Sequence, residues 1–147
     1  MKKTLLPLLF VLSLLIPACS SNQANRPKTP QALQPTAVST ALFQVVKPDG
    51  SKVGVTINDL KTLPLKQVTA EGKVEEGPGL LDVLNFVGVT EFTEVALTGS
   101  SNPVTLTQEQ VDDNTILDFT NHGTVKLSTT YVPKDNWTKD VAEIAVK

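Results

Sequence analysis

From residue 42 onwards, short runs of alternating hydrophobic and polar residues follow one another, and turn-forming residues separate them. Alternation with a period of two is typical of β-strands that bury one face. The strongest turn is 48–51, and 121–123 is a second turn, while the Gly-Pro-Gly at 77–79 predicts a break in the chain. The pattern predicts strands at 42–47, 52–57, 65–69, 73–76, 94–98, 104–106, 115–119, 125–132 and 141–146.

Helical signals interrupt this pattern at a few places. Thr56 with Asp59 predicts the start of a short helix, which Pro64 ends. Leucines and valines recur at helical spacing over 80–87, just before a glycine that suits a helix end. Thr107 with Gln110 has the spacing of a capping box. Short strands with two or three short helices among them predict an α+β fold for residues 42–147.

The N-terminal segment has a different composition. Two lysines precede an apolar run of about twelve residues, which is too short for a spanning helix of ~20 residues. The run ends in Ile16-Pro17-Ala18-Cys19, which resembles the lipobox of bacterial lipoproteins. The resemblance implies that residues 1–18 are a signal peptide and that Cys19 carries a diacylglycerol, often with an acylated amine. Two or more acyl chains anchor a protein stably to a membrane.

Residues 19–41 follow as the lipidated cysteine and a tether. The segment is rich in Ser, Asn, Gln, Thr and Pro, and it has too few large apolar residues to form a core. We therefore expect a flexible spacer between a membrane and the folded part. Ser20 is not an aspartate, so the segment does not resemble the inner-membrane retention signal of Gram-negative lipoproteins. The outer membrane is therefore favoured in a Gram-negative source, and the outer face of the cell membrane otherwise.

Charge and composition exclude several functions. The net charge is −2, and residues 42–147 alone carry about −6 with no arginine, which argues against a nucleic-acid partner. One cysteine in the chain excludes an internal disulfide and a cysteine-based metal centre. A single histidine excludes a multi-histidine metal site, so no metal is expected. With 40% hydrophobic residues, the chain is still able to form a packed core.

The order of segments from 56 to 146 resembles the sulfite-oxidase-type molybdopterin-binding domain. The matching runs are TINDLKTLP at 56–64, EGPGLLDVLNFVGV at 76–89 and VALTG at 95–99, followed by shorter segments around 105–117, 121–123 and 132–144. Each run consists mostly of core and turn residues. The resemblance implies a molybdopterin-domain fold for nearly the whole folded part.

The same resemblance implies a molybdenum cofactor, and here the sequence departs from the family. The family's enzymes bind molybdenum through a cysteine between the first helix and the next one. In this chain that stretch, 65–76, has no cysteine. The family also uses arginines and a histidine for anionic groups, whereas this part of the chain has no arginine and only His122. A thiolate ligand and a cationic pocket are requirements of that chemistry. No cofactor is therefore expected, and molybdopterin is implied by resemblance only.

Five residues are candidates for a ligand-binding face. His122 lies in a turn beside Asn121, either as a ligand contact or as an exposed turn residue. Trp137 lies in a polar loop near Tyr131, either as a binding platform or as a lid packed over strand ends. Lys139 completes the set, which the resemblance places near 65–76. No catalytic residue is predicted.

The acidic residues are poorer candidates. Asp112, Asp113 and Asp118 do not have the spacing of a calcium loop, and charge at helix ends is the simpler interpretation. Adjacent Glu75 and Glu76 on a strand point to opposite faces, which argues against a catalytic carboxylate pair.

These observations leave three functions open. The first is a membrane-anchored lipoprotein whose non-catalytic, molybdopterin-domain-like ectodomain binds a small ligand or an envelope protein. The second is a molybdopterin-dependent oxidoreductase or its subunit. The third is a structural envelope lipoprotein. Because residues 42–147 lack cysteine and arginine, the first is favoured.

Overall fold

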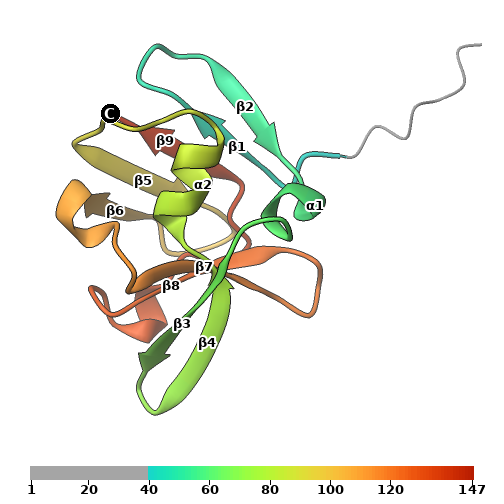
Figure 1. Ribbon diagram of the computed structural model, residues 1–147. Coiled ribbons are helices and arrows are strands. Elements are labelled where there is room, and N and C mark those ends of the chain that lie inside the picture. Colours follow the sequence, from blue (N-terminus) through green and yellow to red (C-terminus); the bar gives the residue numbers. More distant parts are fainter. Residues whose placement is uncertain (1–39) are drawn as a thin grey trace, which may run out of the picture. The chain divides into compact units, whose positions relative to one another are not determined.

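The computed structural model describes residues 40–147, so the predicted signal peptide, Cys19 and nearly all of the tether lie outside the described residues. The described part is α+β, with strands in mixed sheets and short helices between them (Figure 1). In chain order the elements are β1 (Phe43–Val46), β2 (Lys52–Val55), α1 (Ile57–Leu60), β3 (Leu65–Ala70), β4 (Lys73–Pro78), α2 (Leu80–Phe86), β5 (Glu94–Thr98), β6 (Val104–Thr107), η1 (Gln108–Gln110), β7 (Thr115–Phe119), β8 (Val125–Thr129), η2 (Lys134–Asn136) and β9 (Glu143–Val146).

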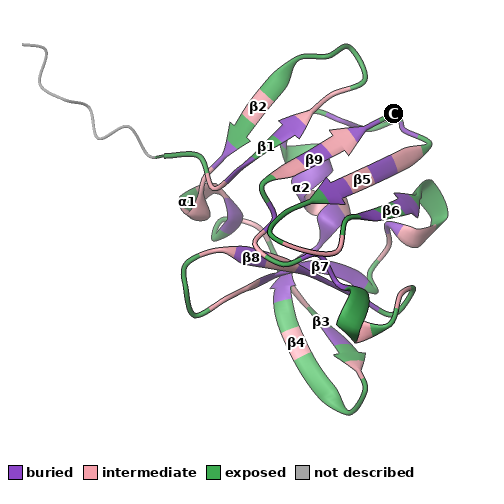
Figure 2. Ribbon diagram, turned by 180° about the vertical axis from the view of Figure 1, so that it is seen from behind, coloured by how far each residue is buried: buried purple, intermediate pink, exposed green. Residues whose placement is uncertain are grey.

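A five-stranded sheet forms the largest layer. Its strand order is β2-β1-β9-β5-β6, with β1 parallel to β9 and all other neighbours antiparallel. Helix α2 lies over one face of this sheet, as the opposite views of Figures 1 and 2 show. The alternating strand residues Val45, Leu97 and Ile144 are fully buried in the same core cluster as Leu84 of α2. Alternation in the sequence therefore corresponds to one buried face of each strand.

The helix signals in the sequence are confirmed. Thr56 caps α1 by accepting from the backbone N–H of Asp59 at 3.2 Å, and the Asp59 carboxylate accepts from the Thr56 backbone N–H at 2.9 Å. Thr107 and Gln110 form the second capping box, at η1. Helix α2 ends where Gly88 takes a positive φ of 79°. No described helix is long and apolar enough to span a membrane.

Two antiparallel hairpins lie outside the main sheet. One is β7–β8, and the other is β3–β4, which we call the arm (residues 65–78). β4 packs against β7, and Gly79 forms an isolated bridge with Ile116. The arm extends from the base of the molecule in Figure 1 and is exposed over much of its length in Figure 2.

The predicted break at 77–79 is wrong at its first two positions, because β4 continues through Gly77 to Pro78. A close approach explains this glycine: a Cβ on Gly77 would lie 2.1 Å from the carbonyl oxygen of Leu117. Pro78 is tolerated because it stands at the end of the strand, opposite Leu65. The glycine therefore serves packing between strands and not a turn.

β2 ends at Val55 instead of residue 57, because Thr56 caps α1, which begins at Ile57. Two further strand boundaries differ from the prediction by two residues or more. β8 ends at Thr129 instead of residue 132, because the chain turns there and the carbonyls of Thr129 and Val132 accept the indole N–H of Trp137. The last strand begins at Glu143 instead of residue 141, because Val141 donates to Val125 of the neighbouring hairpin. Both differences arise from contacts between segments distant in sequence.

Candidate functional site

The turn between β7 and β8 carries Asn121 and His122, both exposed. The backbone N–H of His122 lies 3.3 Å from the hydroxyl oxygen of Thr120, and that of Gly123 donates to the Thr120 carbonyl at 3.2 Å. Asn121 and His122 line a hollow of about 410 Å³. Its other polar lining residues include Glu75 and Lys126, so the turn is next to charged groups from other strands.

Tyr131 lies at a different hollow. The hollow is about 480 Å³, and the tip of the arm at 69–71 and the segment 129–134 line it. The Tyr131 hydroxyl donates to the Asp112 carboxylate at 2.7 Å. That hydrogen bond raises the pKa of Tyr131. Burial raises the pKa of Asp112, but the hydrogen bonds from Tyr131 and Asn114 together outweigh it, so the pKa of Asp112 is lowered. The hydroxyl therefore already has a partner.

Trp137 is buried, with 2% of its surface exposed. Its indole N–H donates to the carbonyls of Thr129 at 3.1 Å and Val132 at 3.2 Å. These bonds satisfy the polar end of a large hydrophobic side chain. The structure thus shows Trp137 as a packed residue, which was the second of the two interpretations of the sequence, and not as an exposed platform.

Lys139 is exposed and lines neither of these two hollows. Its backbone forms an isolated bridge with Ser101, and its carbonyl accepts from the Ser100 N–H at 2.8 Å. The five candidate residues are therefore divided between the two hollows, a packed position and a separate loop, so the structure does not bring them together as one site.

Four charged residues that the sequence did not single out as a group meet between the two hollows. The ammonium of Lys126 lies 3.2 Å from Glu75 and 2.9 Å from Asp118, and the ammonium of Lys134 lies 3.3 Å from Glu75. Both ammonium groups also lie over the ring of Trp137, at 5.6 and 5.5 Å from its centre. We call this set the lysine–carboxylate network; its members are Glu75, Asp118, Lys126 and Lys134.

The two carboxyls of the network differ in acidity. Burial raises the pKa of Asp118, and nearby Glu75 adds to that increase, although Lys126 opposes it. Burial acts on Glu75 in the same direction, but hydrogen bonds from Lys126, Asp118 and Lys134 outweigh it and lower the pKa of Glu75. Burial lowers the pKa of Lys126, but the carboxylates of Asp118 and Glu75 raise it by more, so the pKa of Lys126 is raised. Glu75 is therefore the more strongly held anion.

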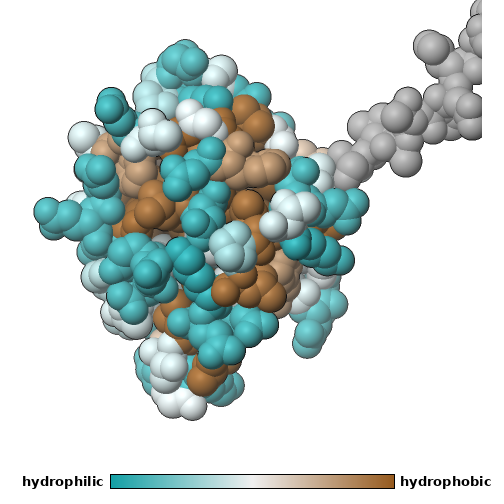
Figure 3. All heavy atoms as spheres, in the orientation of Figure 1, coloured by the Kyte–Doolittle hydropathy of each residue, from teal (hydrophilic) through white to brown (hydrophobic). Residues whose placement is uncertain are grey.

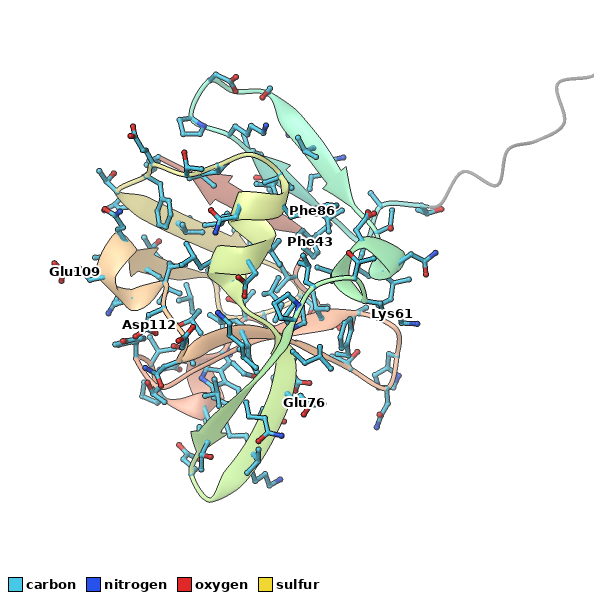
Figure 4. The ribbon with its side chains drawn as sticks, in the orientation of Figure 1. Phe43, Lys61, Glu76, Phe86, Glu109 and Asp112 are labelled. Atoms are coloured by element: carbon cyan, nitrogen blue, oxygen red, sulfur yellow. The ribbon has the colours of Figure 1, made fainter. Side chains whose placement is uncertain are left out.

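The pairing of two of the four network residues could be predicted from the sequence. Asp118 and Lys126 are cross-strand partners in the β7–β8 hairpin, and a turn at 121–123 places them opposite each other. Glu75 and Lys134 come from β4 and η2, which only the tertiary fold brings together. Adjacent Glu75 and Glu76 point to opposite faces of the arm, as predicted. Glu75 faces the two lysines, whereas Glu76, labelled in Figure 4, accepts from Gln67 on the outer face at 2.9 Å.

The aspartates at 112 and 113 have partners other than a helix end. Asp113 accepts from Lys66 at 2.7 Å, and Lys66 also lies 2.9 Å from Asp82 of α2. Asp112 accepts from Tyr131 and from the backbone N–H of Asn114. Among residues 40–147, no group of three or more His, Cys, Asp or Glu side chains is placed to hold a metal ion.

No protein-family model matches the chain, and no curated protein matches its sequence. Its fold is similar to that of the sulfane dehydrogenase SoxCD from Paracoccus pantotrophus, with a TM-score of 0.53 and 18% sequence identity. The match covers 71% of this chain but only 37% of that chain, so this chain spans well under half of the dehydrogenase chain. The similarity shows a distant relation to a molybdopterin-related fold.

The residues of the described part do not fit a molybdenum cofactor. The only cysteine and the only arginine of the chain, Cys19 and Arg26, precede residue 40. The hollow at His122 carries the carboxylates of Glu75 and Asp118 beside the ammonium of Lys126, so its lining has no surplus of positive charge to hold an anionic pterin phosphate. Thiolate ligation and arginine contacts therefore have no counterpart in this part of the chain.

Proposed function

We propose that the chain is a lipid-anchored envelope protein whose folded part binds a small ligand or a protein partner and carries out no molybdenum chemistry. Its molybdopterin-related fold is then used as a binding scaffold. The observation that carries the proposal is the chemistry of the face between the two hollows. Lysines there are paired with carboxylates, and thiol and guanidinium groups are lacking within residues 40–147.

The face has the properties of a recognition surface. Its two hollows of about 410 and 480 Å³ fall in the size range of small-molecule sites. Asn121, His122 and Tyr131 supply donors, acceptors and an aromatic ring from loops on rigid strands. A neutral network between the hollows suits uncharged or mixed-charge ligands better than a phosphate.

The alternative is a molybdopterin-dependent oxidoreductase or its subunit. The similarity in fold to the sulfane dehydrogenase SoxCD favours it. Against it stands the lack of a cysteine in residues 65–76, where the resemblance implies the molybdenum ligand. An enzyme built on this chain would need a different set of ligands.

Native mass spectrometry of the full chain, extracted from its own membranes in detergent, tests the proposal. We expect a bound small molecule or protein that a double variant, Asn121→Ala with His122→Ala, no longer retains. Asn58→Ala, at an exposed position of α1, is the matched control and should retain it. A chain with nothing bound, or binding that the double variant leaves unchanged, would remove this face as the site.

A further inference from the structure

Strand β3 has an open edge. Positive φ at both residues of the arm's turn, 50° at Glu71 and 77° at Gly72, identifies a two-residue hairpin turn. The residues on either side of such a turn form a hydrogen-bonded pair, and hydrogen-bonded pairs alternate along the ladder with β4. The residues whose backbone N–H and C=O groups therefore point away from β4 are Leu65, Gln67 and Thr69. Among residues 40–147 these groups have no other backbone partner, so the edge is able to accept another strand.

The edge is held firmly in place. β4 packs against β7 so closely that a Cβ on Gly77 would lie 2.1 Å from the carbonyl oxygen of Leu117. On β3 itself, the ammonium of Lys66 lies 2.9 Å from Asp82 and 2.7 Å from Asp113. A rigid edge loses little conformational freedom when a strand is added to it, and this favours binding.

The edge borders the hollow of about 480 Å³. Thr69 and Ala70 line this hollow from β3, and Tyr131, Val132 and Pro133 line it from the other side. A strand added to β3 lies about 4.8 Å from it and directs every second side chain to the inner face of the arm. The hollow therefore suits an apolar side chain of the added strand.

The outer face of the arm also offers apolar contacts. Leu65 is 54% exposed and Val74, the cross-strand partner of Thr69, is 60% exposed. Figure 3 shows hydrophobic residues at the surface of the arm among hydrophilic ones. The outward side chains of an added strand would cover part of this apolar surface.

Acidic residues close the groove at the base of the arm. Asp113 accepts from Lys66 on β3, and Asp112 accepts from Tyr131 on the opposite side, each at 2.7 Å. Because Lys66 also pairs with Asp82, the carboxylates outnumber the lysine at this end. The electrostatic potential there favours a cationic side chain on the added strand.

The other end of the groove has no free lysine to oppose this preference. Glu71 lines the hollow and is in no ion pair among residues 40–147, whereas Lys134, which also lines it, is already paired with Glu75. Lys73 is exposed but lies on β4, across the arm from the groove. A basic strand therefore suits the groove better than an acidic one.

The remaining strand edges are less suited to pairing. The outer edge of β8 is already used, because Leu127 donates to the Thr138 carbonyl and Val141 donates to the Val125 carbonyl. β2 and β6, at the edges of the main sheet, have four residues each, whereas β3 has six. Short edge strands are a common protection against strand addition, and β3 lacks it.

We propose that β3 is a docking edge for an extended basic peptide of a protein partner, which adds to the arm as its third strand. Backbone hydrogen bonds at Leu65, Gln67 and Thr69 supply affinity, and the hollow and the acidic ends select the side chains. The proposal rests on the proposed function and specifies its partner as a peptide strand instead of a small molecule.

A synthetic peptide of alternating valine and lysine, about eight residues long and labelled with fluorescein, serves as the probe. Its anisotropy is measured with the full chain in detergent. An alternating glycine–lysine peptide keeps the charge but disfavours a strand, and a valine–glutamate peptide reverses the charge. Hydrogen exchange of the backbone amides, followed by mass spectrometry, locates the bound peptide on the wild-type chain.

Two variants test the edge itself. Thr69→Pro removes one outward N–H, and proline is tolerated at an edge strand where the N–H faces solvent. Thr69→Val is the matched control, because it keeps that N–H. The double variant Asn121→Ala with His122→Ala changes the other hollow and should bind the peptide as wild type does.

We expect the valine–lysine peptide to bind about tenfold more tightly than either control peptide and to slow exchange over residues 65–70. Thr69→Pro should weaken binding about tenfold and Thr69→Val less than about twofold. If Thr69→Pro does not fold, the exchange pattern of the wild type decides. Lack of binding, equal binding of the glycine–lysine peptide, or protection at β2 or β6 in place of β3 overturns the proposal. If native mass spectrometry still shows a ligand that the Asn121/His122 double variant loses, the proposed function stands and only the β3 site fails.

Discussion

The carboxylate of Glu75 and the ammonium of Lys126 lie 3.2 Å apart and join the arm to the β7–β8 hairpin. Glu75 lies next to Val68 across the arm, and Lys126 lies over the ring of Trp137. The pair therefore connects an exposed hairpin to a buried aromatic side chain. Its strength determines how firmly the arm is held against the fold.

Glu75 and Asp118 should differ in their effect on stability. Glu75 binds two lysines and has a lowered pKa, whereas Asp118 binds one lysine and has a raised pKa. At pH 7 we expect Glu75→Gln to reduce the free energy of unfolding by about 2 kcal/mol, and Asp118→Asn by under about 1 kcal/mol. Urea denaturation of both variants measures the difference. Equal losses would contradict the assignment of Glu75 as the central anion.

The contribution of Glu75 should depend on pH in a defined direction. Its pKa in the folded state lies below the ordinary value of 4.5, so its stabilising effect is present above that value and is lost as the pH falls through the folded pKa. The effect of pH on the contribution of Asp118 has the opposite sign: its pKa is raised in the folded state, so protonation of Asp118 at low pH favours folding. The gap in stability between wild type and Glu75→Gln should be constant above about pH 5.5 and shrink below pH 4.5. A gap that persists at pH 2.5 would argue against this mechanism.

Gly77 should tolerate no side chain. A Cβ there would meet the Leu117 carbonyl oxygen at 2.1 Å, and that oxygen belongs to the backbone, so it does not move aside easily. We expect Gly77→Ala to reduce the free energy of unfolding by more than about 3 kcal/mol or to prevent folding. Gly50→Ala is the control: its φ is +82° but nothing lies within 4 Å, so the loss should be about 1 kcal/mol. Thermal unfolding compares the two, and similar losses would refute the packing role of Gly77.

Cys19→Ala tests the membrane anchor. Because lipidation requires the thiol of the only cysteine, the variant should lose its acyl mass and leave the membrane fraction. Fractionation of the cells followed by intact mass measurement checks both effects. Ser20→Ala preserves the thiol and should remain anchored. A Cys19→Ala chain that stays in the membrane fraction would show that another feature holds it there.

Local signals in the sequence were sufficient for most of the fold. The caps at Thr56 and Thr107 and the helix stop at Gly88 are interactions within a few residues, and alternation gives the buried face of each strand. The order of strands in the main sheet could not be predicted in this way, because the last strand of the chain, β9, inserts between β1 and β5. Long-range pairing of this kind has no local pattern.

The candidate site was harder to predict for the same reason. His122 was correctly placed in a turn, but its neighbour Glu75 comes from a strand nearly 50 residues earlier. The position of Trp137 in a polar segment left two interpretations open, a binding platform and a packed lid, and two carbonyls that accept its N–H hold it inside. Burial of a loop tryptophan depends on the segments that cover it, here β8 and its following turn.

Cofactor content tests the central claim most directly. The full chain is exported in a host that makes molybdopterin and extracted in detergent, molybdenum is determined by elemental analysis, and pterin is determined by fluorescence after denaturation. If the fold serves binding without molybdenum chemistry, neither should be found above the level of an unrelated lipoprotein prepared in parallel. Molybdenum and pterin near one equivalent per chain would contradict the account and show that the cofactor is held by ligands other than a cysteine of the folded part.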